Sequence, residues 1–221
     1  MSMLLLAHRG DHASVPENTL AAFAAAIARP GCDGVELDVR ASADGVAVVL
    51  HDATLRRVQG RPEAATDLPA AALRALGVPS LADVLAACPP PAFLDIELKE
   101  DLGAIAVEAL RAARVDAGGI LERAVISSFE PAILRAIRRL EPGWPCWLNA
   151  NDLEPGTLEA AVVLGCRGIS AQASAITPRA AKAVARAGLD LAAFTLSDPR
   201  MLGRLARLGC VAACVEGAAL T

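Results

Sequence analysis

Carboxylates stand in two short segments that otherwise read as apolar strands. In residues 34–39, GVELDV, strand alternation puts Glu36 and Asp38 on one face and three apolar side chains on the other. In residues 94–99, LDIELK, the three charged side chains, Glu97 among them, also share a face. Buried carboxylates that converge repel one another unless a cation binds them. Because all-oxygen ligation suits Mg²⁺ or Ca²⁺, the pattern predicts a divalent metal at Glu36, Asp38 and Glu97.

An ion network is the alternative explanation for the same carboxylates. Arg9, Arg40 and Lys99 stand beside or within these segments and could neutralise the acidic groups without a metal. The sequence alone leaves both possibilities open.

Two of the three histidines, His8 and His51, end apolar strands. Histidine titrates near neutral pH, so the pair is suited to acid–base catalysis, although a structural role is the alternative. His12 falls in the loop after the first strand and is expected to be exposed. The charged groups and both strand-end histidines lie toward the carboxyl ends of strands, which is the catalytic face of an α/β barrel.

Other polar motifs have simpler explanations. Glu17, Asn18 and Thr19 follow a proline and are typical of the start of a helix. Ser127 and Ser128 end a strand without the G-x-S-x-G surroundings of a nucleophilic serine, so covalent catalysis by serine is not favoured.

The elements that must position these residues alternate along the chain. Strands are predicted at 3–8, 34–39, 46–51, 92–98, 124–128, 145–149, 168–171, 190–195 and 210–215. Helices are predicted at 17–28, 80–87, 101–113, 131–140, 155–164, 178–187 and 199–208. This alternation predicts a TIM (β/α)₈ barrel, with residues 1–221 as a single domain. A doubly wound open sheet is the alternative, but its glycine-rich phosphate fingerprint is missing.

Nine strands are one too many for an eight-stranded barrel. Only residues 40–45 separate 34–39 from 46–51, which is too short for a helical crossover, and Asp44-Gly45 is a turn signal. The sequence leaves open which strand stands outside the barrel. Residues 53–79, after the third strand, have weak periodicity and are expected to form a short surface insertion.

Composition excludes several classes of protein. Hydrophobic residues make up 54% and charged residues 21%, so the chain is not disordered, and the net charge of −4 argues against nucleic acid as a partner. No apolar run is long enough to insert stably in a membrane, and no signal peptide is evident. The six cysteines lack zinc spacing and fit buried thiols in a reducing compartment, so a cytoplasmic location is expected. The oligomeric state is left open.

An ordered set of motifs closely resembles the glycerophosphodiester phosphodiesterase family. The set comprises HRG at 8–10, PENT at 16–19, ELDV at 36–39, DG at 44–45, HD at 51–52, IELK at 96–99 and SSF at 127–129. Each motif is weak alone, but their common order is specific.

The resemblance implies a TIM barrel that hydrolyses small-molecule glycerophosphodiesters to glycerol 3-phosphate and an alcohol. It implies His8 and His51 as the acid–base pair, and a divalent metal, Mg²⁺ or Ca²⁺, on the three carboxylates predicted above. Arg9 and Lys99 match residues that contact phosphate. Glu17 matches a residue that orients Arg9 or binds a substrate hydroxyl.

The sequence departs from the family pattern in three places. Phe194 precedes Thr195 where the family commonly has tryptophan, so Phe194 is expected to form the aromatic wall with altered substrate fit. Glu216 stands in a segment, 215–217, that replaces the family's terminal Thr-Asp-Arg-Pro run, and the 53–79 insertion is short. The competing interpretations are a lysophospholipase D-like phosphodiesterase and a non-catalytic phosphate-binding barrel.

Overall fold

Eight parallel strands close into a barrel. The computed structural model describes residues 3–220. The sheet order is β1-β9-β8-β7-β6-β5-β4-β2-β3, and an additional pairing of β1 with β2 closes the ring. The barrel strands are β1 (Leu4–His8), β2 (Gly34–Ala41), β4 (Phe93–Leu98), β5 (Ala124–Ser128), β6 (Cys146–Ala150), β7 (Gly168–Gln172), β8 (Asp190–Leu196) and β9 (Cys210–Val215). The predicted barrel is therefore confirmed.

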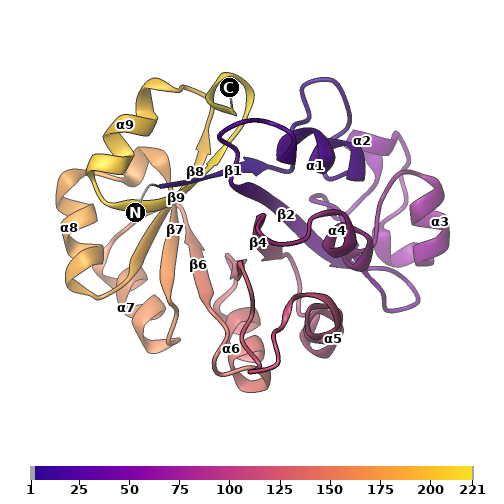
Figure 1. Ribbon diagram of the computed structural model, residues 1–221. Coiled ribbons are helices and arrows are strands. Elements are labelled where there is room, and N and C mark those ends of the chain that lie inside the picture. The colour runs from indigo at the N-terminus through magenta and orange to yellow at the C-terminus, as the bar shows by residue number, and fades with distance from the viewer. Residues whose placement is uncertain (1–2, 221) are drawn as a thin grey trace.

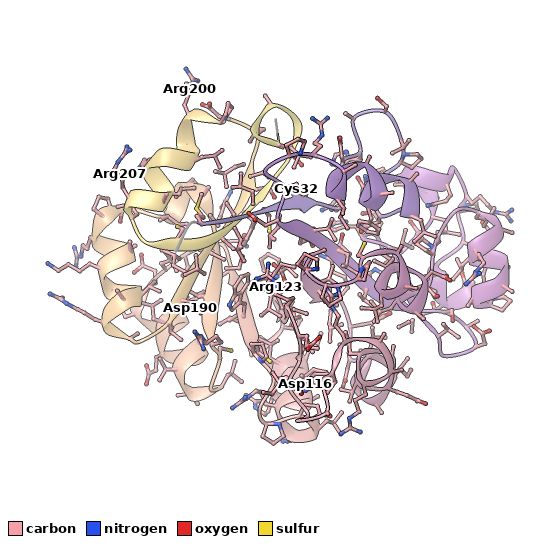
Figure 2. All side chains as sticks on the ribbon, viewed as in Figure 1. Cys32, Asp116, Arg123, Asp190, Arg200 and Arg207 are labelled. Atoms are coloured by element: carbon pink, nitrogen blue, oxygen red, sulfur yellow. The ribbon has the colours of Figure 1, made fainter. Side chains whose placement is uncertain are left out.

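Helices surround the barrel in chain order, as Figure 1 shows. They are α1 (Leu20–Ile27), α4 (Leu81–Ala87), α5 (Gly103–Arg114), α6 (Pro131–Leu140), α7 (Pro155–Val163), α8 (Pro178–Arg186) and α9 (Arg200–Arg207). Each has at least one buried apolar side chain, and on α6 Ile133, Leu134 and Ile137 form a buried apolar stripe. The outer faces carry charge: Arg200 and Arg207 of α9 point into solvent in Figure 2.

The strand outside the barrel is β3 (Ala47–Val49). It pairs with β2 in the antiparallel direction, with Val39 opposite Val49 and Ala41 opposite Ala47. The short connection through Asp44 and Gly45 makes this hairpin, because parallel strands would need a longer crossover. The hairpin resolves the surplus strand of the sequence-based prediction.

Strand alternation divides the core into two parts. Side chains that point outward from the strands, such as Val35, Leu37 and Ile96, pack against the helices. Side chains that point inward form a smaller apolar cluster in the barrel, with Leu6 and Trp147 among its members. Polar residues take over the inward positions toward the carboxyl ends of the strands. This change in polarity along the barrel axis defines where a site can form.

Residues 53–79 fold into a small layer of their own. The layer contains α2 (Arg56–Gln59), a 3₁₀ turn η1 (Ala65–Asp67) and α3 (Ala70–Ala75). Val48, Leu55 and Leu73 belong to a separate buried apolar cluster beneath it. In Figure 1 this layer lies at the side of the barrel beyond α4. Two further 3₁₀ turns are η2 (Ala173–Ala175) and η3 (Gly217–Leu220).

Two further expectations concern the cysteines and membranes. All six cysteines are free, and all but Cys32 are buried. Between residues 3 and 220, no helix is both long enough and apolar enough to cross a membrane.

Candidate active site

Three buried carboxylates meet at the carboxyl ends of β2 and β4. Glu36, Asp38 and Glu97 each offer an oxygen, and these oxygens lie within 4.8 Å of one another. The register places Asp38 beside Glu97 on the neighbouring strand, so strand alternation alone brings them together. Their exposed fractions are at most 8%, so water does little to screen their mutual repulsion.

Two cations partly neutralise this group. Lys99 Nζ lies 2.8 Å from Asp38 Oδ1 and also forms an ion pair with Glu97. Arg9 Nε lies 3.2 Å from Asp38 Oδ2. Burial raises the pKa of Asp38, but the nearby charges of Lys99 and Arg9 outweigh it and hold that pKa below its ordinary value. Part of the ion-network alternative is therefore present in the structure.

Glu36 is the carboxylate that the network leaves short of a cation. It accepts a hydrogen bond from the Arg9 backbone N–H at 3.1 Å, and His8 Nε2 lies 3.9 Å away. Arg40, the third cation of the alternative, instead bonds the His51 carbonyl at 2.9 Å and lies near Glu100. Burial, followed by repulsion from neighbouring carboxylates, raises the pKa of Glu36 well above its ordinary value.

The donor set fits a divalent cation. Asp95 lies on the same inward face, is only 2% exposed, and has its pKa raised to about 7, chiefly by burial. With it, four acidic side chains stand against the charges of Lys99 and Arg9. A hard divalent ion on the oxygens of Glu36, Asp38 and Glu97 would relieve this imbalance. These three carboxylates could hold a metal.

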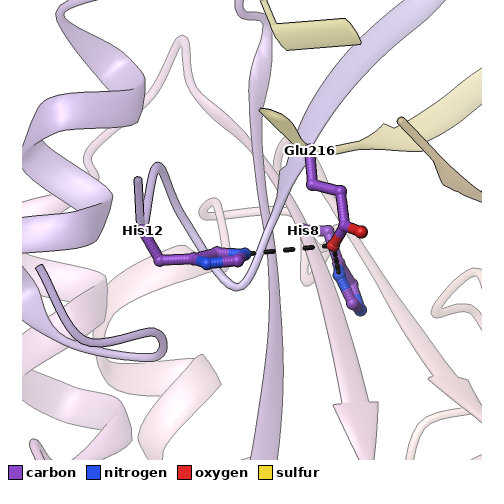
Figure 3. A group of neighbouring side chains, drawn as sticks. All are labelled: His8, His12 and Glu216. Atoms are coloured by element: carbon purple, nitrogen blue, oxygen red, sulfur yellow. Dashed lines mark hydrogen bonds and ion pairs between the residues drawn. The ribbon is translucent and has the colours of Figure 1, made fainter. Parts of the chain in front are cut away.

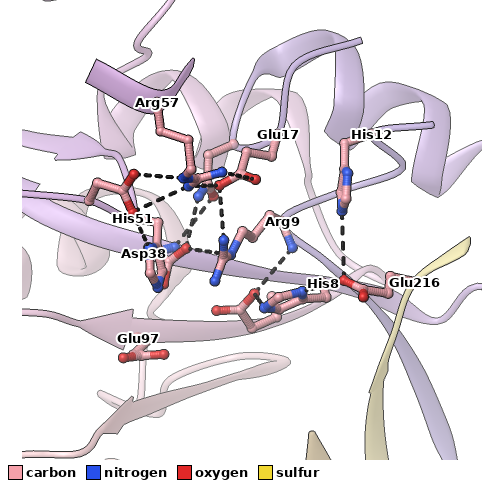
Figure 4. Close-up of polar contacts among 12 residues, drawn as sticks. His8, Arg9, His12, Glu17, Asp38, His51, Arg57, Glu97 and Glu216 are labelled. Atoms are coloured by element: carbon pink, nitrogen blue, oxygen red, sulfur yellow. Dashed lines mark hydrogen bonds and ion pairs between the residues drawn. The ribbon is translucent and has the colours of Figure 1, made fainter. Parts of the chain in front are cut away.

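His8 is held by a carboxylate from the far end of the chain. At the end of β1, its Nδ1 lies 3.0 Å from Oε2 of Glu216, which directly follows β9 (Figure 4). The pKa of His8 is below its ordinary value. Burial and the charge of Arg9 lower it, and they outweigh the hydrogen bond to Glu216, which raises it. Sequence analysis placed Glu216 only in a segment that departs from the family pattern, and no local signal marks it as a partner of His8.

His51 is held in the same way by its neighbour in the sequence. Its Nδ1 lies 2.6 Å from Asp52 Oδ1. Arg57 of α2 donates to Asp52 at 2.7 Å and to both carboxylate oxygens of Glu17. Glu17 in turn accepts from Arg9 at 3.0 Å, as Figure 4 shows. The 53–79 layer thus contributes a side chain to the rim of the site, which the weak periodicity of that segment did not indicate.

The loop before α1 caps the helix and also contributes side chains to the site. The helix was predicted to begin at 17, but Thr19 is its N-cap and accepts from the Ala22 N–H at 3.2 Å. Asn18 therefore precedes the helix, with a φ of 55°, a left-handed conformation that is uncommon outside glycine. Its buried side chain donates to Asp38 Oδ2 at 2.8 Å. The helix-start explanation holds for Thr19 and fails for Glu17 and Asn18.

These residues surround one cavity at the carboxyl end of the barrel. Its volume is about 210 Å³. All the predicted site residues except Asp38 and Glu17 line it, namely His8, Arg9, Glu36, His51, Glu97, Lys99 and Phe194. Phe194 forms one wall together with Phe129, their ring centroids 5.5 Å apart and the rings edge to face. His12, expected to be exposed, is instead partly buried with Nε2 3.9 Å from Glu216.

Several other polar groups line or support the cavity. Asn149 and Ser170, which sequence analysis did not single out, point inward from β6 and β7 and line the cavity wall. Asn149 Oδ1 is buried and has no hydrogen-bond partner within residues 3–220. Ser127 is buried and donates to Asp95 at 2.6 Å, so it supports a carboxylate and is not placed as a nucleophile. Period-2 alternation could have identified the inward positions, but not their partners.

Fold and site together describe an α/β barrel with two carboxylate-held histidines above an acidic cluster, an arrangement suited to phosphate-ester chemistry. Residues 8–217 match the model of the glycerophosphoryl diester phosphodiesterase family. The chain belongs to this family, and the resemblance drawn from its motifs is confirmed.

Individual relatives agree with this assignment. The chain is 32% identical to a glycerophosphodiester phosphodiesterase of Caldanaerobacter subterraneus over 64% of each sequence. It is 29% identical to human glycerophosphodiester phosphodiesterase 1 over 62% of this chain and 45% of the relative. The matches thus span less than two thirds of these relatives' own lengths.

Solved structures match over more of the chain. A phosphodiesterase of Oleispira antarctica, solved in complex with the product sn-glycerol-3-phosphate, superposes with a TM-score of 0.86 at 25% identity, covering 96% of this chain and 92% of that one. A glycerophosphodiester phosphodiesterase of Thermotoga maritima has a TM-score of 0.82 at 25% identity, covering 100% and 96%.

Proposed function

We propose that this chain hydrolyses glycerophosphodiesters to glycerol 3-phosphate and an alcohol at the cavity described above. The observation that carries the proposal is the joint placement of His8, His51, Arg9 and Lys99 around one cavity that also includes two of the three clustered carboxylates. The Oleispira antarctica relative, which holds sn-glycerol-3-phosphate, supports the substrate class.

The two histidines are suited to move protons during the reaction. A carboxylate holds Nδ1 of each ring, which leaves Nε2 free to face a substrate. One ring would take the proton of the attacking hydroxyl or water, and the other would protonate the departing alkoxide. Each such step contributes roughly 10²–10⁴-fold to the rate.

The cations of the site would stabilise the negative charge of the phosphate. Arg9 can present its guanidinium fork to a phosphate, and Lys99 adds a point charge beside it. A divalent metal on Glu36, Asp38 and Glu97, with Mg²⁺ or Ca²⁺ as the candidates, would offset the negative charge that grows on the phosphate in the transition state. Glu17 orients Arg9 through their hydrogen bond at 3.0 Å.

The remaining walls are suited to the organic part of the substrate. Phe194 and Phe129 offer an apolar surface, and Asn149 Oδ1 can accept from a substrate hydroxyl because it has no partner within the described residues. We also propose a cytoplasmic location, which the free thiols of all six cysteines support.

The test is hydrolysis of glycerophosphocholine and glycerophosphoethanolamine by protein stripped of metal with EDTA. Mg²⁺, Ca²⁺ and Mn²⁺ are returned one at a time, and the release of glycerol 3-phosphate is followed. We expect release that depends on metal and falls by roughly 10²-fold or more in His8→Ala and in His51→Ala.

His12→Ala is the matched control. His12 is the third histidine of the chain and does not line the cavity, so this variant should retain hydrolysis when Mg²⁺, Ca²⁺ or Mn²⁺ is returned in zinc-free buffer. The proposal is overturned if wild type releases no product with any of the metals, or if the His51→Ala and His12→Ala variants lose activity equally.

A further inference from the structure

A second group of metal-ligating side chains lies beside the carboxylate cluster. His8, His12 and Glu216 each offer one donor atom, and these atoms lie within 4.8 Å of one another. Figure 3 shows both imidazole rings directed at the Glu216 carboxylate, His8 from β1 and His12 from the loop that follows. The group contains two nitrogens and one carboxylate, whereas the acidic cluster offers oxygens only.

The spacing of these atoms is close to that of a tetrahedral metal centre. Ligand atoms about 2.0–2.2 Å from a tetrahedral Zn²⁺ lie about 3.3–3.6 Å apart. Glu216 Oε2 lies 3.0 Å from His8 Nδ1 and 3.9 Å from His12 Nε2. These two distances bracket the required value.

The group is open to an ion from solvent. The exposed fractions of the side chains are 17% for His8, 31% for His12 and 36% for Glu216, so solvent reaches all three. His12 and Glu216 also line a separate cavity of about 200 Å³, next to Asp11 and Ser197. This cavity leaves room for a water as the fourth ligand.

We propose that His8 Nδ1, His12 Nε2 and the Glu216 carboxylate form an inhibitory site for Zn²⁺. Two histidines and a carboxylate are a common set for zinc, whereas Mg²⁺ and Ca²⁺ prefer oxygen ligands. The two neighbouring clusters therefore select different metals, and an excess of Mg²⁺ does not displace the zinc.

Inhibition follows from which nitrogen of His8 the metal takes, and this part rests on the proposed function. In the free protein the neutral ring can carry its proton on Nδ1, donate it to Glu216 and present an unprotonated Nε2 to the substrate. A metal bound at Nδ1 leaves the proton of the neutral ring on Nε2. That nitrogen can then no longer accept a proton, so acid–base cycling at His8 stops.

Binding is tested without any enzyme assay. Zn²⁺ titration by calorimetry, and the visible absorption of Co²⁺ as a coloured substitute, report the affinity of the site and the coordination of its metal in protein kept in saturating Mg²⁺, which occupies the carboxylate cluster. We expect one site whose affinity falls at least ~10-fold in His12→Ala and in Glu216→Ala, because each variant removes a ligand. Cys32→Ser is the matched control, since Cys32 is the one cysteine that is not buried, and it should bind Zn²⁺ as wild type does.

Inhibition is tested at saturating Mg²⁺, with each variant compared with its own zinc-free rate. Half-inhibition of His12→Ala should require at least ~10-fold more Zn²⁺ than that of wild type. Unchanged zinc affinity in His12→Ala would overturn the site. Normal binding without inhibition would overturn the inhibitory role and retain the site. If wild type has no Mg²⁺-dependent hydrolysis at all, the proposed function fails, and the calorimetry still decides the zinc site.

Discussion

Each histidine of the cavity depends on one carboxylate for its orientation. Glu216 holds His8 Nδ1 at 3.0 Å, and Asp52 holds His51 Nδ1 at 2.6 Å. The pairings fix which ring nitrogen faces the cavity, and a carboxylate also stabilises the ring when it carries charge. At the residue scale, the proposed acid–base chemistry would therefore depend on these two pairs.

Glu216→Ala should lower kcat by about 10-fold or more while KM changes little, since Glu216 does not line the substrate cavity. Steady-state kinetics with glycerophosphocholine, in zinc-free buffer, checks this. Glu216→Gln should recover part of the loss because its amide oxygen can still accept from Nδ1–H. Glu159→Ala, an exposed carboxylate on α7, is the control. A rise in KM with unchanged kcat in Glu216→Ala would contradict the assigned role.

Neither pair was predicted from the sequence, and the two differ in how far apart their members lie along the chain. Asp52 follows His51 directly, so their proximity is local. Glu216 lies 208 residues from His8, and only closure of the barrel brings it there. Patterning identifies inward positions on each strand, but it does not specify which strand ends face one another across the barrel.

At the scale of elements, alternation and helical periodicity predicted nearly all of the barrel. The strand positions follow from short apolar runs, and the faces of Glu36 and Glu97 follow from period 2. The start of α1 was wrong by a few residues, because the hydrogen bonds of Glu17 and Asn18 to the site prevail over their helix-start preference. The helices of the 53–79 layer were not predicted from the sequence, because such short helices show no sustained hydrophobic periodicity.

Arg57 links this layer to the barrel and should give the protein part of its acid sensitivity. Hydrogen bonds from Arg57 hold the pKa of Asp52 at about 2. Burial raises the pKa of Glu17, but Arg57 and Arg9 outweigh it and bring that pKa to about 2. Both carboxylates have folded-state pKa values below their ordinary ones, so their stabilisation is present above about pH 4.5 and is lost as the pH falls toward 2.

Arg57→Ala should therefore lower the free energy of unfolding at neutral pH by about 1 kcal/mol or less, because the ion pair of Arg57 with Glu17 is partly exposed. The difference from wild type should shrink as the pH falls from about 4.5 to 2. Urea unfolding across this range measures the difference, with Arg56→Ala, an exposed arginine of the same helix, as the control. A difference that stays constant with pH would show that Arg57 acts through packing and not through these carboxylates.

At the scale of the whole molecule, the buried acidic cluster lowers the stability of the folded barrel. Glu36 and Asp95 are buried and have raised pKa values, chiefly through burial, so their charged forms oppose folding. The fold predicted from sequence follows from apolar patterning, whereas this cost depends on charges that β2 and β4, far apart in the sequence, bring side by side in the barrel.

A divalent metal should consequently raise Tm. At a concentration ~100 times its Kd, an ion that binds only the folded state adds about 2.7 kcal/mol, or roughly 5–10 °C for a chain of this size. Differential scanning fluorimetry with Mg²⁺, Ca²⁺ or Mn²⁺ measures the shift. Glu36→Gln should abolish most of it and should itself be at least as stable as metal-free wild type. An equal shift in wild type and Glu36→Gln would exclude Glu36 as a ligand.

Within the barrel, β1 also pairs with β9, more than 200 residues later in the chain, and this pairing has a consequence for synthesis. The ribosome adds roughly 5–20 residues per second, so His8 waits about 10–40 s before Glu216, 208 residues later, has been made. Until β9 docks, the acidic residues of β2 and β4 have no finished cavity around them. A nascent chain that lacks β9 therefore also lacks Glu216 beside His8, and the proposed hydrolysis is expected to begin only after both have been translated.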